Sequence, residues 1–157
     1  MLQEHAISTS AWNPALNINI ERWLSDRQQL LVEYCNLSHK TLDDDSKVDC
    51  AEKLRHLCQT LIDYVSVGHF GIYDKILSES KQQAESVLSQ TLQHFSLVDE
   101  TTDKVLDFND KYLETDDLSV LIDDLSALGE ILESRFSAED SMMSVLHYHR
   151  PDARLLN

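Results

Sequence analysis

The sequence LIDYVSVGHFGIYDKIL (Leu61–Leu77) decides the fold, because it carries a helical apolar pattern through two glycines. Its apolar residues recur at the spacing of a helix that buries one side: Leu61, Val65, Ile72 and Ile76. Gly68 and Gly71 interrupt this pattern, and a glycine inside a helix costs roughly 1 kcal/mol relative to alanine. Such a pair is typical of a kink or of a close approach by another backbone. We therefore predict one long helix that is kinked near Gly68–Gly71.

Three further segments show the same helical pattern, and few residues interrupt them. The chain has only three glycines and two prolines in 157 residues, which favours long helices over strands. We predict helices over about 17–38, 46–80, 82–114 and 118–148. They pack most simply as an all-α, antiparallel four-helix bundle that forms one domain over residues 1–157. Residues 1–16 are predicted to be a loose N-terminal arm and residues 150–157 a mobile tail.

Each predicted helix has an apolar stripe, and three of these stripes contain a polar residue. Arg27 lies in the first stripe, His69 in the second and Glu139 in the fourth. We place Leu92 near the buried side of the third helix and Ile122 in the fourth stripe. Buried charges are stable only when paired. We interpret Arg27, His69 and Glu139 as a buried polar network that fixes the register of the helices; the alternative is a pocket lined by the same side chains.

The most informative feature of the composition is the formal net charge of −15. A surface this acidic repels nucleic acid and anionic lipid, and it attracts basic partners over long distances. The alternative is that the charge serves solubility alone. The first residues lack the pattern of a signal peptide, and Cys35, Cys50 and Cys58 contain no CxxC pair, so we expect free thiols in a reducing cytoplasm. No apolar run approaches the length of a membrane span.

The sequence contains no motif that would supply catalysis. We find no phosphate-binding glycine loop and no nucleophile elbow, so we predict no enzyme activity, no catalytic residue and no cofactor. A di-iron bundle would need Glu-x-x-His on two helices, and no such pair occurs. Glu52 and His56 are four residues apart, but no second pair repeats their spacing. Cys58 is interpreted as a small core residue, and no metal site is predicted.

Three segments of the chain resemble the Rsd/AlgQ family of anti-sigma regulators. They are RWLSDRQQLLVEYCNL (Arg22–Leu37), CQTLIDYVSVGHFGIYDKIL (Cys58–Leu77) and LSALGEILESRFSAED (Leu125–Asp140). The most specific pieces are D-Y-x-S-x-G-H-F at Asp63–Phe70 and E-x-R-F-x-x-E-D at Glu133–Asp140, which occur in the family's order. The resemblance extends from about Ile20 to Met143 and hardly includes the N-terminal arm.

The resemblance implies a bacterial, cytoplasmic, all-helical protein that binds the primary sigma factor. Its target would be the C-terminal sigma domain that reads the promoter through a basic helix-turn-helix. Occupying that domain would lower the use of primary sigma by RNA polymerase in stationary phase. Relatives also suggest an alternative, a metabolic or stringent-response adaptor that binds the phosphocarrier HPr or the alarmone enzyme SpoT. The acidic composition agrees with the first reading, because carboxylates compete with DNA phosphates for the same Lys and Arg side chains.

Asp63 is the residue that we expect to contact the partner. It lies about 100° around the helix from the core stripe, so its carboxylate should face outward. We expect four neighbours to share its face: Gln59, Thr60, Val67 and Phe70. An arginine could lay its stem on Phe70 and pair its guanidinium with Asp63. The resemblance implies the same contact, since this aspartate matches the position through which relatives engage a basic residue of sigma; the alternative is a solvated helix acid.

Overall fold

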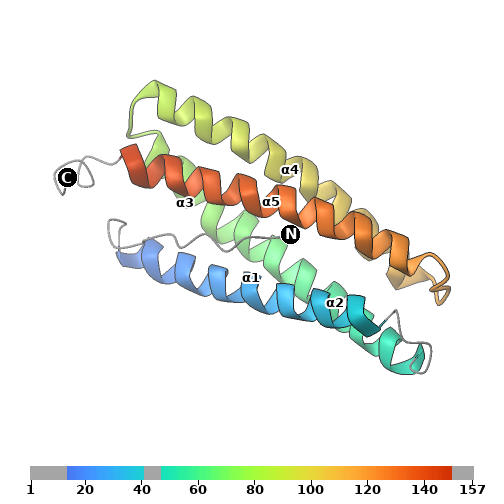
Figure 1. The fold of residues 1–157 in the computed structure, drawn as a ribbon. Helices are drawn as coiled ribbons and strands as arrows, with labels where there is room; N and C mark the ends of the chain where they lie inside the picture. The colour runs from blue at the N-terminus through green and yellow to red at the C-terminus, as the bar shows by residue number, and fades with distance from the viewer. Residues whose placement is uncertain (1–13, 41–46, 150–157) are drawn as a thin grey trace.

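A computed structural model gives the fold, and it describes residues 14–40 and 47–149 (Figure 1). The described chain is helical, with short connections and no strand in these two ranges, so the all-α prediction is confirmed. The elements are, in order, α1 (Pro14–Lys40), α2 (Lys47–Val67), a π-helical segment η1 (Gly68–Ile72), α3 (Tyr73–Ser80), α4 (Glu85–Glu114) and α5 (Leu121–His149). None of these helices is long and apolar enough to cross a membrane.

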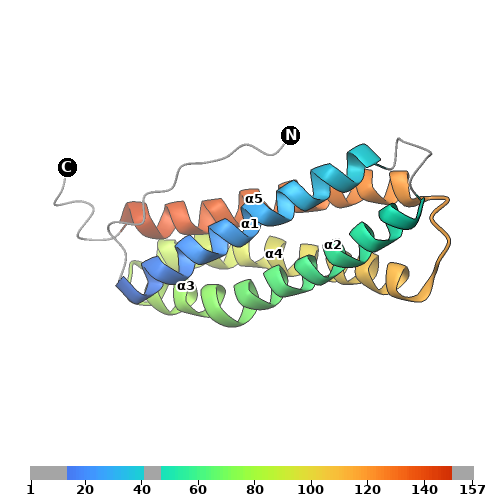
Figure 2. The same cartoon turned by 90° about the horizontal axis from the view of Figure 1, so that it is seen from below.

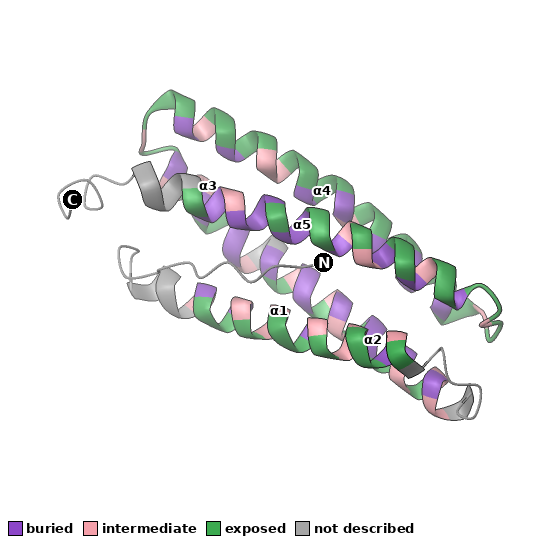
Figure 3. Ribbon diagram, in the orientation of Figure 1, coloured by how far each residue is buried: buried purple, intermediate pink, exposed green. Residues whose placement is uncertain are grey.

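The helices run up and down in an antiparallel bundle, as Figures 1 and 2 show from two sides. α1 lies along α2, and α4 lies along α5 and against α2 and α3. Large apolar side chains from α1, α2, α4 and α5 fill the centre, where they include Trp23, Leu30, Leu57, Leu61, Val98, Val105, Leu125, Leu132 and Phe136. Their spacing of three and four residues explains the purple positions that recur along each helix in Figure 3.

α1 and α5 meet through a tyrosine on one helix and a glycine on the other. The Tyr34 hydroxyl of α1 donates a hydrogen bond to the Leu125 carbonyl of α5 at 2.7 Å. A Cβ atom on Gly129 would collide with this hydroxyl. Glycine at this position therefore permits the close approach of Tyr34. The hydrogen bond from Tyr34 to the Leu125 carbonyl compensates for the low helix propensity of Gly129.

Several predicted boundaries move by a few residues. α1 begins at Pro14 rather than near residue 17, so residues 14–16 belong to the helix and not to the predicted arm. Proline suits this place, since the first turn needs no backbone N–H donor. α5 begins at Leu121 rather than at Leu118, because Leu118–Val120 form a turn closed by the bond from the Leu121 N–H to the Leu118 carbonyl. The predicted tail at residues 150–157 lies outside the described residues.

At the predicted kink the structure has a π-helical segment, so the chain stays helical from α2 through to α3. The Tyr73 N–H donates to the Gly68 carbonyl, five residues back, instead of to a carbonyl four residues back. This wider turn shifts the side chains that follow it relative to α-helical spacing. Figure 2 shows the chain changing direction between α2 and α3.

The two glycines of this segment differ in their surroundings. A Cβ atom on Gly68 would lie 2.8 Å from the Tyr73 hydroxyl and 3.3 Å from Trp23 Nε1. A Cβ atom on Gly71 would meet nothing within 4 Å. The glycine pair was expected to mark a kink or, as the alternative, a close approach by another backbone; the close approach in the structure is made by side chains, and only at Gly68.

Two residues assigned to buried stripes are exposed. Leu92 has 48% of its surface exposed, because it lies more than 100° around α4 from the buried line through Val98 and Val105. Ile122 is 51% exposed in the first turn of α5, at the edge of the line through Leu121 and Leu125.

Candidate functional site

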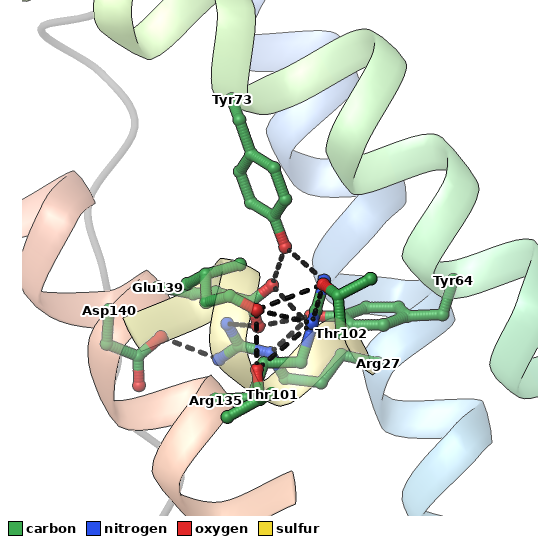
Figure 4. A network of polar contacts seen from close by, with 9 residues as sticks. Arg27, Tyr64, Tyr73, Thr101, Thr102, Arg135, Glu139 and Asp140 are labelled. Atoms are coloured by element: carbon green, nitrogen blue, oxygen red, sulfur yellow. Dashed lines mark hydrogen bonds and ion pairs between the residues drawn. The ribbon is translucent and has the colours of Figure 1, made fainter. Parts of the chain in front are cut away.

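Glu139 of α5 lies at the centre of a buried polar network, and its two carboxylate oxygens have matching partners (Figure 4). The Tyr64 hydroxyl of α2 donates to Oε1 at 2.8 Å, and the Tyr73 hydroxyl of α3 donates to Oε2 at 2.5 Å. Each hydroxyl in turn accepts a hydrogen bond from an arginine: Arg27 Nε donates to Tyr64 at 3.2 Å, and Arg135 Nη2 donates to Tyr73 at 2.8 Å. The carboxylate is thus linked to two guanidinium groups through two phenols.

The same arginines also contact Glu139 directly. Arg27 Nη2 lies 3.4 Å from Oε1, and Arg135 Nε lies 3.6 Å from Oε2. Arg27 Nη1 makes a second ion pair, with Asp140 Oδ1 at 2.6 Å. Two positive and two negative side chains are therefore gathered together, so that each buried charge has a partner.

Arg135 ties α4 into the network. This arginine is fully buried on α5, and its Nη1 donates to the Val98 carbonyl and to the hydroxyls of Thr101 and Thr102 at 2.8–3.2 Å. α1, α2, α3, α4 and α5 consequently all contribute to one set of hydrogen bonds. A cluster of this kind specifies how the helices align. A shift of α1 against α5 would separate Arg27 from Glu139 and Asp140, and a shift along α2, α3 or α4 would break the hydrogen bonds that these helices make to the charged groups.

Aromatic rings enclose Arg27 and hold it in place. The guanidinium carbon lies 4.8 Å from the centre of the Phe136 ring and 5.4 Å from that of Trp23. Trp23 also stacks on Tyr64 at 5.5 Å between ring centres. Trp23 and Arg27 are four residues apart on α1, in the pattern W-x-x-x-R, so they lie one turn apart on the same side of the helix.

Burial dominates the acid–base properties of this cluster. It raises the pKa of Glu139, whereas Arg135, Arg27 and the two tyrosine hydroxyls act in the opposite direction. Burial and the neighbouring carboxylate raise the pKa of Tyr64 and of Tyr73 well above the usual value of 10.0. Both phenols therefore stay protonated and act as donors at every physiological pH.

Arg27 and Glu139 were predicted to meet, and the structure places them in contact. The side chain of His69, the third predicted member, lies outside the described residues, so its membership stays a prediction. Six side chains of the network were not predicted: Tyr64, Tyr73, Thr101, Thr102, Arg135 and Asp140. Spacing held a signal for one of them, since Arg135 lies three residues after the buried Leu132 and four before Glu139.

Asp63 lies on the outer side of α2, and its side chain is exposed. Gln59, one turn earlier, donates from Nε2 to Asp63 Oδ1 at 2.9 Å. Val67, one turn later, is 42% exposed. The three residues form what we name the Asp63 face, an oriented carboxylate between an amide and an exposed apolar side chain.

Thr60 and Phe70 complete the predicted face in different ways. Thr60 is half-buried, and its hydroxyl donates to the His56 carbonyl of its own helix at 3.1 Å. The side chain of Phe70 lies outside the described residues. Its prediction assumed α-helical spacing, which the backbone does not keep between Gly68 and Ile72.

His56, which was considered as a metal ligand together with Glu52, pairs with a residue of another helix. His56 Nε2 lies 3.0 Å from Glu33 Oε1 of α1, and not beside Glu52 in a shared site. Across residues 14–40 and 47–149, no three His, Cys, Asp or Glu side chains gather as a metal would require. Cys58 is buried, and burial raises the pKa of its thiol to about 11, which suits a core residue and not a nucleophile.

Comparison with known proteins identifies what the chain resembles. The model of the family described as "Regulator of RNA polymerase sigma(70) subunit, Rsd/AlgQ" matches residues 1–147. The chain is 35% identical over 136 residues to the regulator of sigma D of Pectobacterium atrosepticum, a match that covers 83% of this chain and 89% of that protein. It is 36% identical over 132 residues to the regulator of sigma D of Salmonella paratyphi B, with 81% and 80% covered.

Proposed function

Because the chain belongs to the Rsd/AlgQ family of regulators of the RNA polymerase sigma(70) subunit, we propose that it binds the primary sigma factor through the Asp63 face. The family assignment makes the chain an anti-sigma regulator and not an enzyme. The finer proposal is that its target is the C-terminal sigma domain, which reads the promoter through a basic helix-turn-helix.

The hydrogen bond from Gln59 to Asp63 is the observation that carries this proposal. It fixes one carboxylate oxygen at 2.9 Å and leaves the other available to a partner. A carboxylate already held in place loses little side-chain freedom on binding. Val67 beside it offers apolar surface for the methylene stem of an arginine or lysine. An arginine guanidinium is the group best suited to such a carboxylate.

The charge of the whole chain supports the same partner. A helix-turn-helix domain exposes Lys and Arg that neutralise DNA phosphates. A net charge of −15 attracts such a domain over long distances and speeds the first encounter. Binding at the Asp63 face would then occupy Lys and Arg side chains of the sigma domain that otherwise contact promoter DNA.

The expected consequence is a smaller pool of primary sigma available to RNA polymerase. Alternative sigma factors would gain from this in stationary phase, and the protein would act in the cytoplasm, where the polymerase works. The alternative role, as an adaptor for HPr or SpoT, receives no support from the comparisons, which name a sigma regulator.

The test is a set of titrations with separated parts of the partner. Purified chain is titrated with full-length primary sigma, with its isolated C-terminal domain, and with sigma lacking that domain. We expect the first two to bind with similar affinity and the third to bind far more weakly. Equal binding of sigma that lacks the C-terminal domain would contradict the proposed target. Tight binding of HPr or SpoT without any binding of sigma would contradict the function itself.

A further inference from the structure

Three leucines on the outer side of α4 lack a covering helix. Leu92 is 48% exposed, Leu106 38% and Leu113 69%, so each leaves part of a large apolar side chain in solvent. At 100° per residue they lie within an arc of about 60°, and they extend over about 32 Å of the helix. We name these three residues the α4 stripe. Figure 3 shows that much of α4 is exposed along this length.

The α4 stripe is lined by acids and by no base. Asp99, Asp103 and Asp110 are exposed and lie in or beside the same arc. The two lysines of α4 point to the other flank, where Lys104 pairs with Glu100 at 3.8 Å and Lys111 with Asp124 at 2.6 Å. The stripe therefore combines apolar side chains with uncompensated negative charge.

The spacing along the α4 stripe indicates the shape of what would cover it. Leu106 and Leu113 are seven residues apart, and Leu92 and Leu106 are fourteen apart. Positions that repeat every seven residues keep facing a second helix that lies alongside the first. Asp99 occupies the intervening position of the same repeat, where one polar residue selects a matching partner.

We propose that the α4 stripe is a docking surface for a basic amphipathic helix of a partner protein. The apolar side of that helix covers the three leucines, while its Lys or Arg side chains meet Asp99, Asp103 and Asp110. A second copy of this chain fits poorly, because it would bring the same acids against one another in a protein of net charge −15. Apolar contact with the leucines gives such a helix its residence time, and the acids select a helix that carries positive charge.

This surface is separate from the Asp63 face, and the inference does not rest on the proposed function. The Asp63 face is on the flank of α2 where His56 reaches Glu33 of α1. The stripe begins on the flank of α4 where Phe95 packs against Tyr73 of α3, with 5.8 Å between ring centres. Two partners, or two parts of one partner, could therefore be bound at the same time.

The test uses a synthetic, fluorescently labelled three-heptad peptide with leucine at the first and fourth positions, and alanine and lysine at the others. Its affinity is measured for the full chain at physiological salt by fluorescence anisotropy. We expect saturable binding that falls about tenfold or more in the double variant Leu106→Asn/Leu113→Asn. The matched control is Leu97→Asn, since Leu97 is 50% exposed on the opposite flank of α4 and should leave the affinity within about twofold.

Further controls decide the proposal. A peptide with glutamate in place of lysine should not bind, and Asp63→Ala should leave binding of the lysine peptide unchanged. Equal affinity for the double variant and the wild type would mean that net charge alone attracts the peptide, which overturns the proposal. A loss of affinity in Asp63→Ala would overturn the placement on α4. Concentration-dependent dimers that disappear in the double variant would make a second copy the occupant and overturn the proposed partner.

Discussion

The Tyr73 hydroxyl donates to Glu139 Oε2 at 2.5 Å, and this bond connects the π-helical segment to the centre of the bundle. Tyr73 is the residue that closes the wide turn, because its N–H donates to the Gly68 carbonyl. One residue therefore fixes both the backbone of the turn and one oxygen of the buried carboxylate. The segment that follows the Asp63 face is thereby bonded, through Tyr73, to a buried carboxylate of α5 that lies 66 residues further along the sequence.

Replacing Glu139 by glutamine should destabilise the fold strongly. The change keeps the shape of the side chain but leaves the fully buried Arg135 and the partly buried Arg27 without their shared counter-charge. We expect a loss of about 3 kcal/mol or more in the free energy of unfolding, measured by urea denaturation. Glu130→Gln, at an exposed position of the same helix, should change stability by less than about 0.5 kcal/mol. A similarly small effect at Glu139 would show that the network reaches water, as the pocket alternative requires.

The two glycines of the π-helical segment should respond in opposite ways to alanine. Gly68→Ala places a Cβ atom against Tyr73, whose hydroxyl is held by Glu139 and Arg135, and should cost about 1–3 kcal/mol. Gly71→Ala meets open space and should stabilise by about 0.5–1 kcal/mol through its higher helix propensity. Thermal unfolding of both variants measures the difference. If both substitutions destabilised the fold equally, the backbone of the π-helical turn, and not the packing of Tyr73 against Gly68, would be what requires glycine.

Cys58 should make the fold less stable in alkali. Burial raises the pKa of its thiol from the usual 9.0 to about 11. Between these values the unfolded chain has released a proton that the folded chain still holds, so stability is full below pH 9 and is lost as pH rises towards 11. This one thiol accounts for at most about 2.7 kcal/mol.

The measurement compares unfolding free energies of the wild type and Cys58→Ala across that range. Tyr64 and Tyr73 also destabilise the folded chain in alkali, but they do so in both proteins. The gap between the two stability curves should therefore narrow as pH rises from 9 to 11. A constant gap would mean that the Cys58 thiol ionises as readily in the folded chain as in the unfolded one.

Sigma binding should weaken as salt rises. Attraction between a chain of net charge −15 and a basic domain acts through solvent, where about 0.15 M salt screens charges beyond roughly 8 Å. We expect the association rate to fall steeply with ionic strength while the dissociation rate changes much less. Surface plasmon resonance at several salt concentrations separates the two rates. An affinity that stays flat over this range would remove the electrostatic support for the proposed function.

Local spacing was enough to predict the helices and the outward position of Asp63. Asp63 follows from helical geometry within one turn of α2, where neighbouring leucines define the buried side. Arg27 and Glu139 were recognised because each interrupts an apolar stripe. Leu92 and Ile122 were wrongly predicted to be buried. The sequence does not show whether another helix covers an apolar residue at the edge of a stripe.

Local spacing in the sequence could not predict the π-helical segment or most of the polar network. A pair of glycines is compatible with a kink, a break or a wide turn, and the local sequence does not distinguish them. In the wide turn that forms, the Tyr73 hydroxyl bonds to Glu139. Its acceptor is 66 residues away in the sequence, on another helix. Tyr64 and Tyr73 read as ordinary core aromatics, since only the tertiary contact shows that their hydroxyls are needed.

The measurement that tests the central proposal most directly is the affinity of Asp63→Ala for the C-terminal domain of the primary sigma factor. The exposed Asp63 contributes little to folding, so the variant should unfold at nearly the wild-type temperature. We expect it to lose about 1–3 kcal/mol of binding free energy, whereas Asp74→Ala, at an exposed position of α3, should bind as the wild type does. Wild-type affinity in a folded Asp63→Ala variant would contradict the assignment of the Asp63 face as the sigma-binding surface.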